Sequence, residues 1–539
     1  MPPSLMRSPL SLALLSLGLG GLTMLPANAE ELSVNTRSDV LFQSVTGAGK
    51  ASSFYDTGTH LMHETDVRWG TQIMDGKWNS LLNTTLRATD SRQFDPENLS
   101  IQKLEWKLSD ANTQINFGDY FANLSPYSMT KGIKGAAFQR NFENDQNYVR
   151  AAYGSFDGQW AYLLRSPAQE PMDRYGGGVR IQKAGEKARV GFNLAHVEDS
   201  EGDPRRTDPA FSQMLGAVDW EYRESALVVS GEHAFADTDE MRLGVATQSR
   251  NGNAHKISAR AALKNLNLDG QAERVSSNFL TLGGGATPDR LRYYLKGDYK
   301  LTREWRLFAT WDDYEDNVDN QLARTTETSS LELGVKKSRA FGRRHMNVST
   351  SWRQKNTDAS DGSRDDQSDR IKFKISDRVG ENYDWRGEVE RVLDENHTTP
   401  SNATSTLWDF GLGYRKRLES SWDIRANLDV GRQETGNLTT PGQDVSDRIR
   451  IGFTADRGNG TQVGASYDWS DANLVTALAD NNHKRANVYW QTKPAWLKSG
   501  YLKFDYSDYL HNFEDSTKDY REQIGKISLV WNFQKEAKK

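Results

Sequence analysis

From residue 407 onwards, apolar and polar side chains alternate along segments of about nine residues. In residues 407–415 the even positions are aromatic or leucine, whereas the odd positions from 409 onwards are Asp, Gly, Gly and Arg. Residues 422–430 repeat the pattern, with Trp, Ile, Ala, Leu and Val on one side and Asp, Arg, Asn and Asp on the other. Successive side chains of a strand point to opposite faces of a sheet, so this period of two predicts β-strands rather than helices.

Strand length and connection length indicate which β-architecture this is. Strands of a soluble sandwich average five or six residues, whereas segments of nine or more are long enough to cross a bilayer at a tilt. The connections alternate between tight turns, such as 302–304 and 418–421, and long polar stretches, such as 356–369 and 511–522. Short turns at one rim and long loops at the other predict an all-β chain that forms one antiparallel transmembrane barrel, with periplasmic turns and extracellular loops.

The N-terminus has the features of an export signal. Arg7 precedes a Leu-rich apolar stretch from Leu10 to Leu25, and Ala27-Asn28-Ala29 fits the small-x-small cleavage pattern. We expect residues 1–29 to be a cleaved signal peptide, residues 30–533 to form the barrel, and residues 534–539 to form a short periplasmic tail. The mean hydropathy of -0.75 agrees with a barrel, because lumen-facing residues and loops are polar.

The strand count is regular in the second half of the chain and irregular in the first. Residues 291–533 give thirteen strands, and the first half offers fifteen candidates, including 158–165 and 241–249. The order of turns and loops slips near 121–133 and 264–289. Because such barrels usually have an even number of strands, we predict about 26, with a range of 24–28. For residues 118–136, an ordinary kinked strand and loop is favoured over a segment folded into the lumen.

Alternation also assigns residues to the two faces of the barrel. The polar set predicted to face the lumen is Asp409, Arg415, Asp423, Arg425, Asp429, Arg448, Arg450 and Asp456. The set predicted to face lipid, or to carry the assembly signal, is Trp408, Phe410, Tyr414, Trp422, Leu529, Trp531 and Phe533. A lumen wall of both signs suits water and general polar traffic better than strict ion selection, which favours rings of one charge.

Motifs for chemistry are few. The chain has no cysteine, which excludes disulfides, thiolate zinc sites and attached haem. His60 and His63 would lie on opposite faces of one strand, and the acidic stretch from Asp358 to Asp369 lacks the spacing of a calcium loop. Gly283-Gly284-Gly285 is interpreted as a flexible connection. The net charge of -5 argues against a nucleic-acid partner. We therefore expect no enzyme activity, no cofactor and no metal site.

The last strand resembles the final strand of Gram-negative outer-membrane barrels. Ile527, Leu529, Trp531 and Phe533 alternate with Ser528, Val530 and Asn532, although six residues follow the terminal Phe. The resemblance implies that this strand is recognised by the barrel-assembly machinery. It also implies a location in the cell outer membrane, in contact with its lipid and with lipopolysaccharide.

The expected function is a wide conduit that passes solutes or houses a partner protein, because no globular plug precedes the strands. In size the chain is similar to the barrel component of porin-cytochrome conduits, which implies a multihaem cytochrome as a partner in the alternative function of extracellular electron transfer. Some members of that family carry an N-terminal Cys-x-x-Cys, which this chain lacks. A polysaccharide-export or adhesin barrel is a second alternative.

Overall fold

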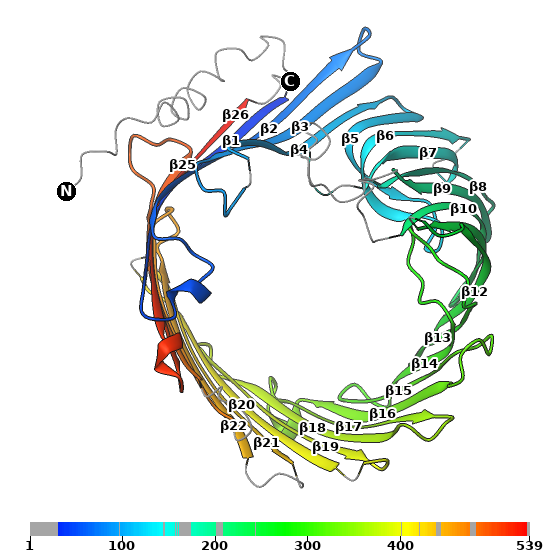
Figure 1. Ribbon diagram of the computed structural model, residues 1–539. Coiled ribbons are helices and arrows are strands. Elements are labelled where there is room, and N and C mark those ends of the chain that lie inside the picture. The colour runs from blue at the N-terminus through cyan, green and yellow to red at the C-terminus, as the bar shows by residue number, and fades with distance from the viewer. Residues whose placement is uncertain are drawn as a thin grey trace.

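A computed structural model describes residues 31–535, apart from 96, 144–145, 157, 159, 161–173, 201–208, 243, 400, 420, 438–442 and 475–480. Within these residues, 26 strands form one antiparallel sheet in which each strand pairs with its neighbours in sequence. β1 pairs with β2 on one side and with β26 on the other, so the sheet closes into the ring seen in Figure 1. The predicted fold class and strand number are confirmed.

The strands of the first half are Glu31–Thr46 (β1), Gly58–Ile73 (β2), Trp78–Thr89 (β3), Leu99–Ser109 (β4), Thr113–Asn123 (β5), Thr130–Phe142 (β6), Asn147–Ser155 (β7), Arg174–Ala184 (β8), Ala188–Asp199 (β9), Ala210–Glu224 (β10), Leu227–Met241 (β11), Gln248–Ala262 (β12) and Leu266–Val275 (β13). Those of the second half are Arg290–Lys300 (β14), Trp305–Asp316 (β15), Thr326–Ser338 (β16), Asn347–Ala359 (β17), Asp365–Val379 (β18), Tyr383–Asn396 (β19), Ser401–Arg417 (β20), Asp423–Asn437 (β21), Gln443–Asp456 (β22), Gln462–Asn473 (β23), Asn481–Thr492 (β24), Gly500–Phe513 (β25) and Tyr520–Lys535 (β26). Short 3-10 turns occur at Lys50–Ser52 (η2), Ala340–Gly342 (η3) and Ser516–Lys518 (η4).

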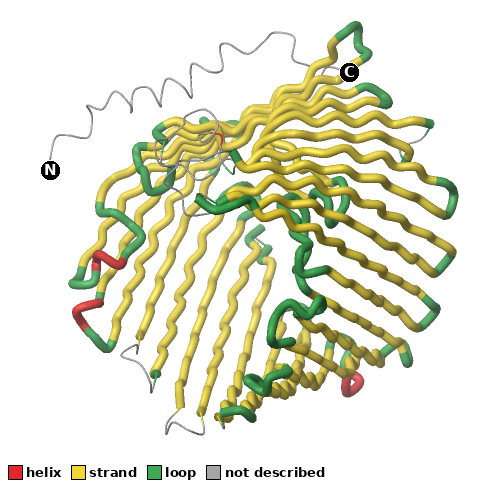
Figure 2. The backbone as a smooth tube through the Cα atoms, turned by 45° about the vertical axis from the view of Figure 1, so that its right-hand side comes forward, coloured by secondary structure: helices red, strands yellow, loops and turns green. Residues whose placement is uncertain are grey.

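The strands are long and tilted, as Figure 2 shows. They range from 9 residues in β7 to 17 residues in β20, whereas about 9–11 tilted residues suffice to cross a bilayer. Connections such as 225–226 and 380–382 define a turn rim, and connections such as 276–289 and 317–325 define a loop rim at the opposite end. β1 begins and β26 ends at the turn rim, because the number of strands is even.

The ladders extend further towards the loop rim than the sequence predicts. Residues 356–369 are predicted as a loop, yet β17 continues to Ala359 and β18 begins at Asp365. Both faces of these extensions are polar, so the alternation disappears although the backbone pairing continues. At the other end, β26 extends two residues past Phe533, to Lys535.

One face of the sheet is apolar and exposed, as a lipid-facing surface must be. On β10, β11 and β12, Met214, Phe235 and Ile257 are 48%, 61% and 47% exposed. On the opposite face of the same strands, Ala217 and Ala234 are buried. Aromatic and aliphatic side chains are exposed around the ring in the same way, which is the pattern of a transmembrane β-barrel.

Two connections of the loop rim fold back onto the inner face along β5–β13. Residues 124–129 supply Leu124, Tyr127 and Met129 to two buried clusters, and residues 276–289 supply Phe279. Figure 1 shows the second connection, drawn in green, inside the ring. The inner layer, defined as residues 124–129 and 276–289, contradicts the favoured interpretation of 118–136 as an ordinary kinked strand and loop. Its apolar residues Leu124, Tyr127 and Met129 are interspersed with Ser125, Pro126 and Ser128, so the sequence favours an ordinary loop there.

Thirteen of the fifteen candidate strands of the first half correspond to described strands. Residues 241–249 are not one strand, because β11 ends at Met241 and β12 begins at Gln248. The spacing of Met241, Val245 and Thr247 is compatible with a strand. The described part of 242–247, however, pairs with no neighbouring strand. Candidate 158–165 lies almost wholly outside the described residues. Across the part of the chain that the structure describes, no helix combines the length and the apolarity needed to span a membrane.

Candidate functional site: the inner face of the barrel

The inner face is fixed by the residues that contact the inner layer. Tyr127 packs with Leu215, Ala217 and Ala234 on the inner side of β10 and β11. Residues that are directly paired on neighbouring strands have side chains on the same face of the sheet. The inner face can therefore be followed from strand to strand around the whole ring by means of the pairing register. The pairs that continue it include Lys296↔Thr310, Glu332↔Arg353 and Asp409↔Gly431.

The eight polar residues predicted for the lumen all lie on this inner face, within β20, β21 and β22. Most of them join ion pairs that cross between strands. Arg448 Nη2 lies 2.9 Å from Asp409 Oδ2, and Asp423 Oδ2 accepts from both Arg415 and Arg425, at 2.9 and 3.1 Å.

The remaining polar residues of the predicted set have partners of three kinds. Asp429 accepts from Arg386 at 2.5 Å, and Arg450 donates to Asp468. Asp456 instead accepts the backbone N–H of Gly458, at 2.7 Å, in the turn that follows β22. Most charged side chains on the inner wall of these strands are therefore paired with a side chain of opposite charge.

The apolar residues predicted to face lipid lie on the opposite face. Trp408 and Phe410 are 52% and 45% exposed. In the last strand, Trp531 and Phe533 have ring centroids 6.3 Å apart, and Phe533 packs against Leu32 and Val34 of β1. Tyr414 and Leu529 belong to the same side of the sheet, and Trp422 directly precedes β21. The seam between β26 and β1 is therefore closed by apolar contacts as well as by its ladder.

The inner layer is held to the wall by buried polar contacts. The backbone N–H of Tyr127 donates to Glu232 at 3.0 Å, and its hydroxyl donates to Glu273 at 2.6 Å. Gln213 donates to the carbonyl oxygen of Leu280 and accepts the backbone N–H of Leu282. The glycine run 283–285, interpreted from sequence as flexible, is packed: the Thr130 N–H donates to the Gly283 carbonyl at 2.9 Å.

A basic patch, defined as Arg353, Lys355 and Arg370, lies on the inner face near the loop rim. Arg353 of β17 and Arg370 of β18 are directly opposite in the register. Arg353 Nε donates to Ser330 Oγ at 3.0 Å, and Arg370 Nε lies 3.5 Å from Glu390 Oε1. Among the described residues, no carboxylate lies within 4.0 Å of Arg353 or Lys355.

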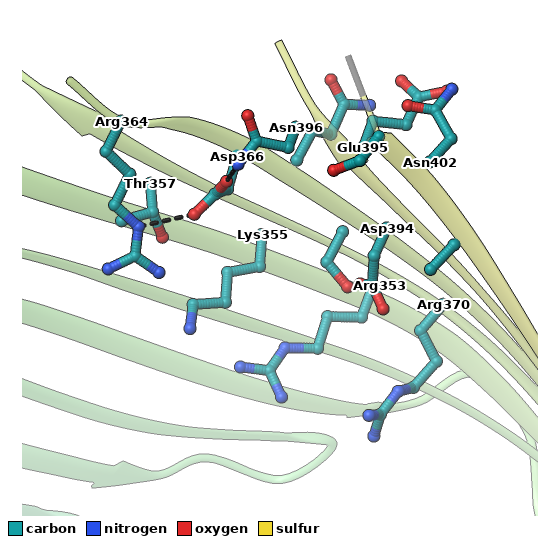
Figure 3. Close-up of a pocket in the computed structure, with 14 residues that line it drawn as sticks. Arg353, Lys355, Thr357, Arg364, Asp366, Arg370, Asp394, Glu395, Asn396 and Asn402 are labelled. Atoms are coloured by element: carbon teal, nitrogen blue, oxygen red, sulfur yellow. Dashed lines mark hydrogen bonds and ion pairs between the residues drawn. The ribbon is translucent and has the colours of Figure 1, made fainter. Parts of the chain in front are cut away.

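The patch borders a hollow of about 510 Å³ between β17, β18, β19 and β20. Figure 3 shows the long side chains of Arg353, Lys355 and Arg370 extending in the same direction, whereas Asp366 lies beside Arg364 and Glu395 lies beside Asn396 and Asn402. Of the three acidic groups that line this hollow, Asp366 accepts from Arg364 at 2.5 Å and Glu395 lies 3.6 Å from His397, whereas Asp394 has no ion-pair partner among the described residues.

Sequence reasoning missed the basic patch because it placed residues 356–369 in a loop and assigned neither Arg353 nor Lys355 to a face of the barrel. Extending the polar alternation of Ser349 and Ser351 by two and four residues would have put Arg353 and Lys355 on the same face. In the described residues, no group of three or more metal-ligating side chains is gathered in one place. His63 instead bonds Ser38 and Thr65, at 2.8 and 2.9 Å.

Comparison with known proteins leaves the family open. No protein-family model matches the chain, and no curated protein matches it. Among solved structures, the P pilus usher (PapC) translocation pore is similar over 93% of this chain and 99% of its own, with 11% identity and a TM-score of 0.33. The Pseudomonas aeruginosa protein OccK2 (OpdF), in complex with glucuronate, is similar over 68% of this chain and 98% of its own, with 10% identity and a TM-score of 0.33. A bacterial polysaccharide outer membrane secretin covers 65% of this chain and 100% of its own, with 10% identity and a TM-score of 0.28. These values are too low to assign the chain to the family of any of these proteins.

Proposed function

We propose that this chain is the barrel of an outer-membrane conduit whose bore holds a second protein. The observation that carries the proposal is the number of strands. With strands about 4.8 Å apart and tilted by about 40°, a closed ring of 26 has a backbone diameter of roughly 50 Å. Facing sheets pack about 10 Å apart, so the side chains of one wall fill only about 5 Å, and roughly 40 Å remains.

A bore of this width exceeds what solute passage needs, since 16–18 strands already enclose an aqueous channel. The inner layer narrows only the arc along β5–β13 where it packs. The paired charges of β19–β22 suit a wall in contact with water or with a polar protein surface. In the outer membrane, the turn rim of such a conduit faces the periplasm and the loop rim faces outward.

Two measurements test the proposal. Tagged barrel is purified from outer membranes in mild detergent and analysed by mass spectrometry and haem staining, and the same chain refolded alone is inserted in planar bilayers. We expect an exported protein at one copy per barrel. We also expect the barrel alone to conduct more than about twice as much as a sixteen-stranded porin, because the enclosed area grows with the square of the strand number.

The identity of the partner separates the alternatives. A haem-staining partner supports the electron-conduit sheath, in which this chain supplies insulation and the cytochrome supplies the haems. A barrel that purifies alone and conducts at the full level of the refolded chain contradicts the proposal and supports a general channel.

A further inference from the structure

We infer that the paired imidazoles of His483 and His511 bind a divalent transition-metal ion, of the class of Zn²⁺, Ni²⁺ and Cu²⁺. The two residues are directly opposite in the pairing of β24 with β25, and their Nδ1 atoms lie 3.0 Å apart. Two nitrogen ligands at about 2.1 Å from one ion are about 3.0–3.4 Å apart when the angle between them is square-planar or tetrahedral. The pair therefore already has the separation of a chelate. Sequence spacing does not reveal it, because only the register brings the two residues together.

The pair faces the bore rather than lipid. Val488 of β24 and Tyr506 of β25 are 52% and 44% exposed on the outer face. Each histidine lies an odd number of residues from the exposed residue of its own strand, and therefore on the opposite face. Both histidines are close to the loop rim, where β24 begins and β25 ends. The His511 side chain is 22% exposed, so an ion dissolved in the bore can reach it.

A buried carboxylate supports one of the two ligands. Glu522 of β26 has a side chain that is 9% exposed, and its Oε2 lies 3.6 Å from His511 Nε2. Ser53 Oγ donates to the other oxygen of this carboxylate at 2.6 Å. Among the described residues, His511 Nε2 is buried and has no hydrogen-bond partner. A metal ion on Nδ1 leaves the ring proton on Nε2, where it faces Glu522, and a carboxylate in this position orients the ring and strengthens metal binding.

The other neighbours of the pair leave room for a cation. Ser470 of β23 and Tyr520 of β26, which are uncharged, lie directly opposite the two histidines on their outer sides. Arg485 follows at the next inner position of β24, where its guanidinium lies over the ring of Tyr509. Within the described residues, Glu522 is the carboxylate that lies within 4.0 Å of a ring nitrogen of the pair. Because it approaches the far nitrogen of His511, the ion has two protein ligands and keeps its other positions for water.

A second histidine pair lacks these surroundings. His233 and His255 are directly opposite on β11 and β12, and their Nδ1 atoms are also 3.0 Å apart. They lie on the outer face, each two residues from an exposed apolar side chain, Phe235 or Ile257. The residue directly opposite His255 on β13 is the cation Arg274. Lipid and a positive charge disfavour a metal ion there, so this pair is a matched control.

The experiment uses the full chain without a histidine tag, refolded in non-ionic detergent and titrated with ZnCl₂ in a calorimeter. Four proteins are compared: the wild type, the site variant His483→Gln/His511→Gln, the control variant His233→Gln/His255→Gln, and Glu522→Gln. The site and control variants each remove one directly opposed histidine pair. Circular dichroism checks that each barrel is folded.

We expect the wild type and the control variant to bind Zn²⁺ with similar Kd, and the site variant to show no saturable binding over the same range of concentration. Glu522→Gln should bind roughly tenfold more weakly than the wild type, because the carboxylate that orients the His511 ring is lost. Equal Kd values for the site variant and the control variant, or no saturable binding to the wild type, would overturn the inference.

Electron paramagnetic resonance of the wild type loaded with one equivalent of Cu²⁺ tests the ligands without any variant. Imidazole nitrogens suit Cu²⁺ as well as Zn²⁺, and Cu²⁺ binds a given site more tightly. We expect the hyperfine pattern of two nitrogen ligands. A spectrum of oxygen ligands alone would refute the site even if the site variant fails to fold. Neither measurement depends on a second protein in the bore, so a failure here leaves the proposed conduit intact.

Discussion

Arg180 lies in the wall beneath the inner layer, and its guanidinium is buried. It donates to both carboxylate oxygens of Asp219, at 2.6 and 2.8 Å, and to the carbonyl oxygen of Leu124 at 2.5 Å. The side chain is 6% exposed and that of Asp219 is 17% exposed. One residue therefore connects β8 to β10 and attaches the inner layer to both. A buried charge is tolerated here because the guanidinium donates to a carboxylate and to further polar acceptors around it, among them Tyr148 and Gln182.

Arg180→Met should destabilise the barrel by about 3–5 kcal/mol, because it leaves Asp219 buried without its partner and the Leu124 carbonyl without its donor. Urea unfolding in lipid vesicles, followed by tryptophan fluorescence, measures the change. Arg189→Met is the matched control on the next strand. Arg189 pairs with Glu221 at 3.0 Å but is 47% exposed, so its loss should cost less than about 1 kcal/mol. Equal losses for the two variants would show that the Arg180 contacts do not hold the layer.

At the scale of elements, the second half of the chain is predictable because its inner face meets water. From β14 to β26 the inner side chains are largely polar and the outer ones largely apolar, so the period of two survives and all thirteen strands are predicted. Along β5–β13 the inner layer covers the wall, and the inner positions become small or apolar, such as Ala152, Leu215 and Ala236. Alternation fades there, and the predicted order of turns and loops slips near 121–133 and 264–289, where the two segments of the inner layer lie. Ion pairs such as Arg448 with Asp409 depend on the register between strands, which sequence spacing does not give.

The fit of the inner layer is tested at two adjacent glycines. A Cβ at Gly284 would lie 2.3 Å from the carbonyl oxygen of Tyr127, whereas a Cβ at Gly285 would meet no atom within 4 Å. Gly284→Ala should therefore push the two segments apart and cost about 1–3 kcal/mol, as overpacking does. Gly285→Ala should leave the free energy of unfolding unchanged within about 0.5 kcal/mol. The same urea titration measures both, and equal values would mean that residues 124–129 and 276–289 do not pack as the structure has them.

At the scale of the whole molecule, the ring is continuous but uneven. β4 and β5 pair over five residues only, from Glu105↔Gly118 to Ser109↔Gln114. Gly118 has a φ of +97°, and beyond it β4 and β5 are joined by side-chain contacts instead of backbone pairing. Asp119 accepts the backbone N–H of Leu104 at 2.7 Å and the indole N–H of Trp160 at 2.9 Å, and Lys134 Nζ lies 2.6 Å from it. The pairing of β20 with β21, by contrast, runs from Ala403↔Asn437 to Arg417↔Asp423.

A closed barrel has no free edge, so local opening has to begin at the shortest ladder, and we expect it to begin between β4 and β5. In hydrogen-exchange mass spectrometry, peptides that cover 104–118 should exchange faster than peptides that cover 423–433. Asp119→Ala removes the acceptor that Leu104, Trp160 and Lys134 share, so it should speed exchange in 104–118 and leave 423–433 unchanged. Glu198→Ala is the control, because its carboxylate is 50% exposed and pairs only loosely with His196, at 3.5 Å. If exchange in Asp119→Ala rises uniformly around the ring, the barrel opens as one unit and the short ladder is not its weak point.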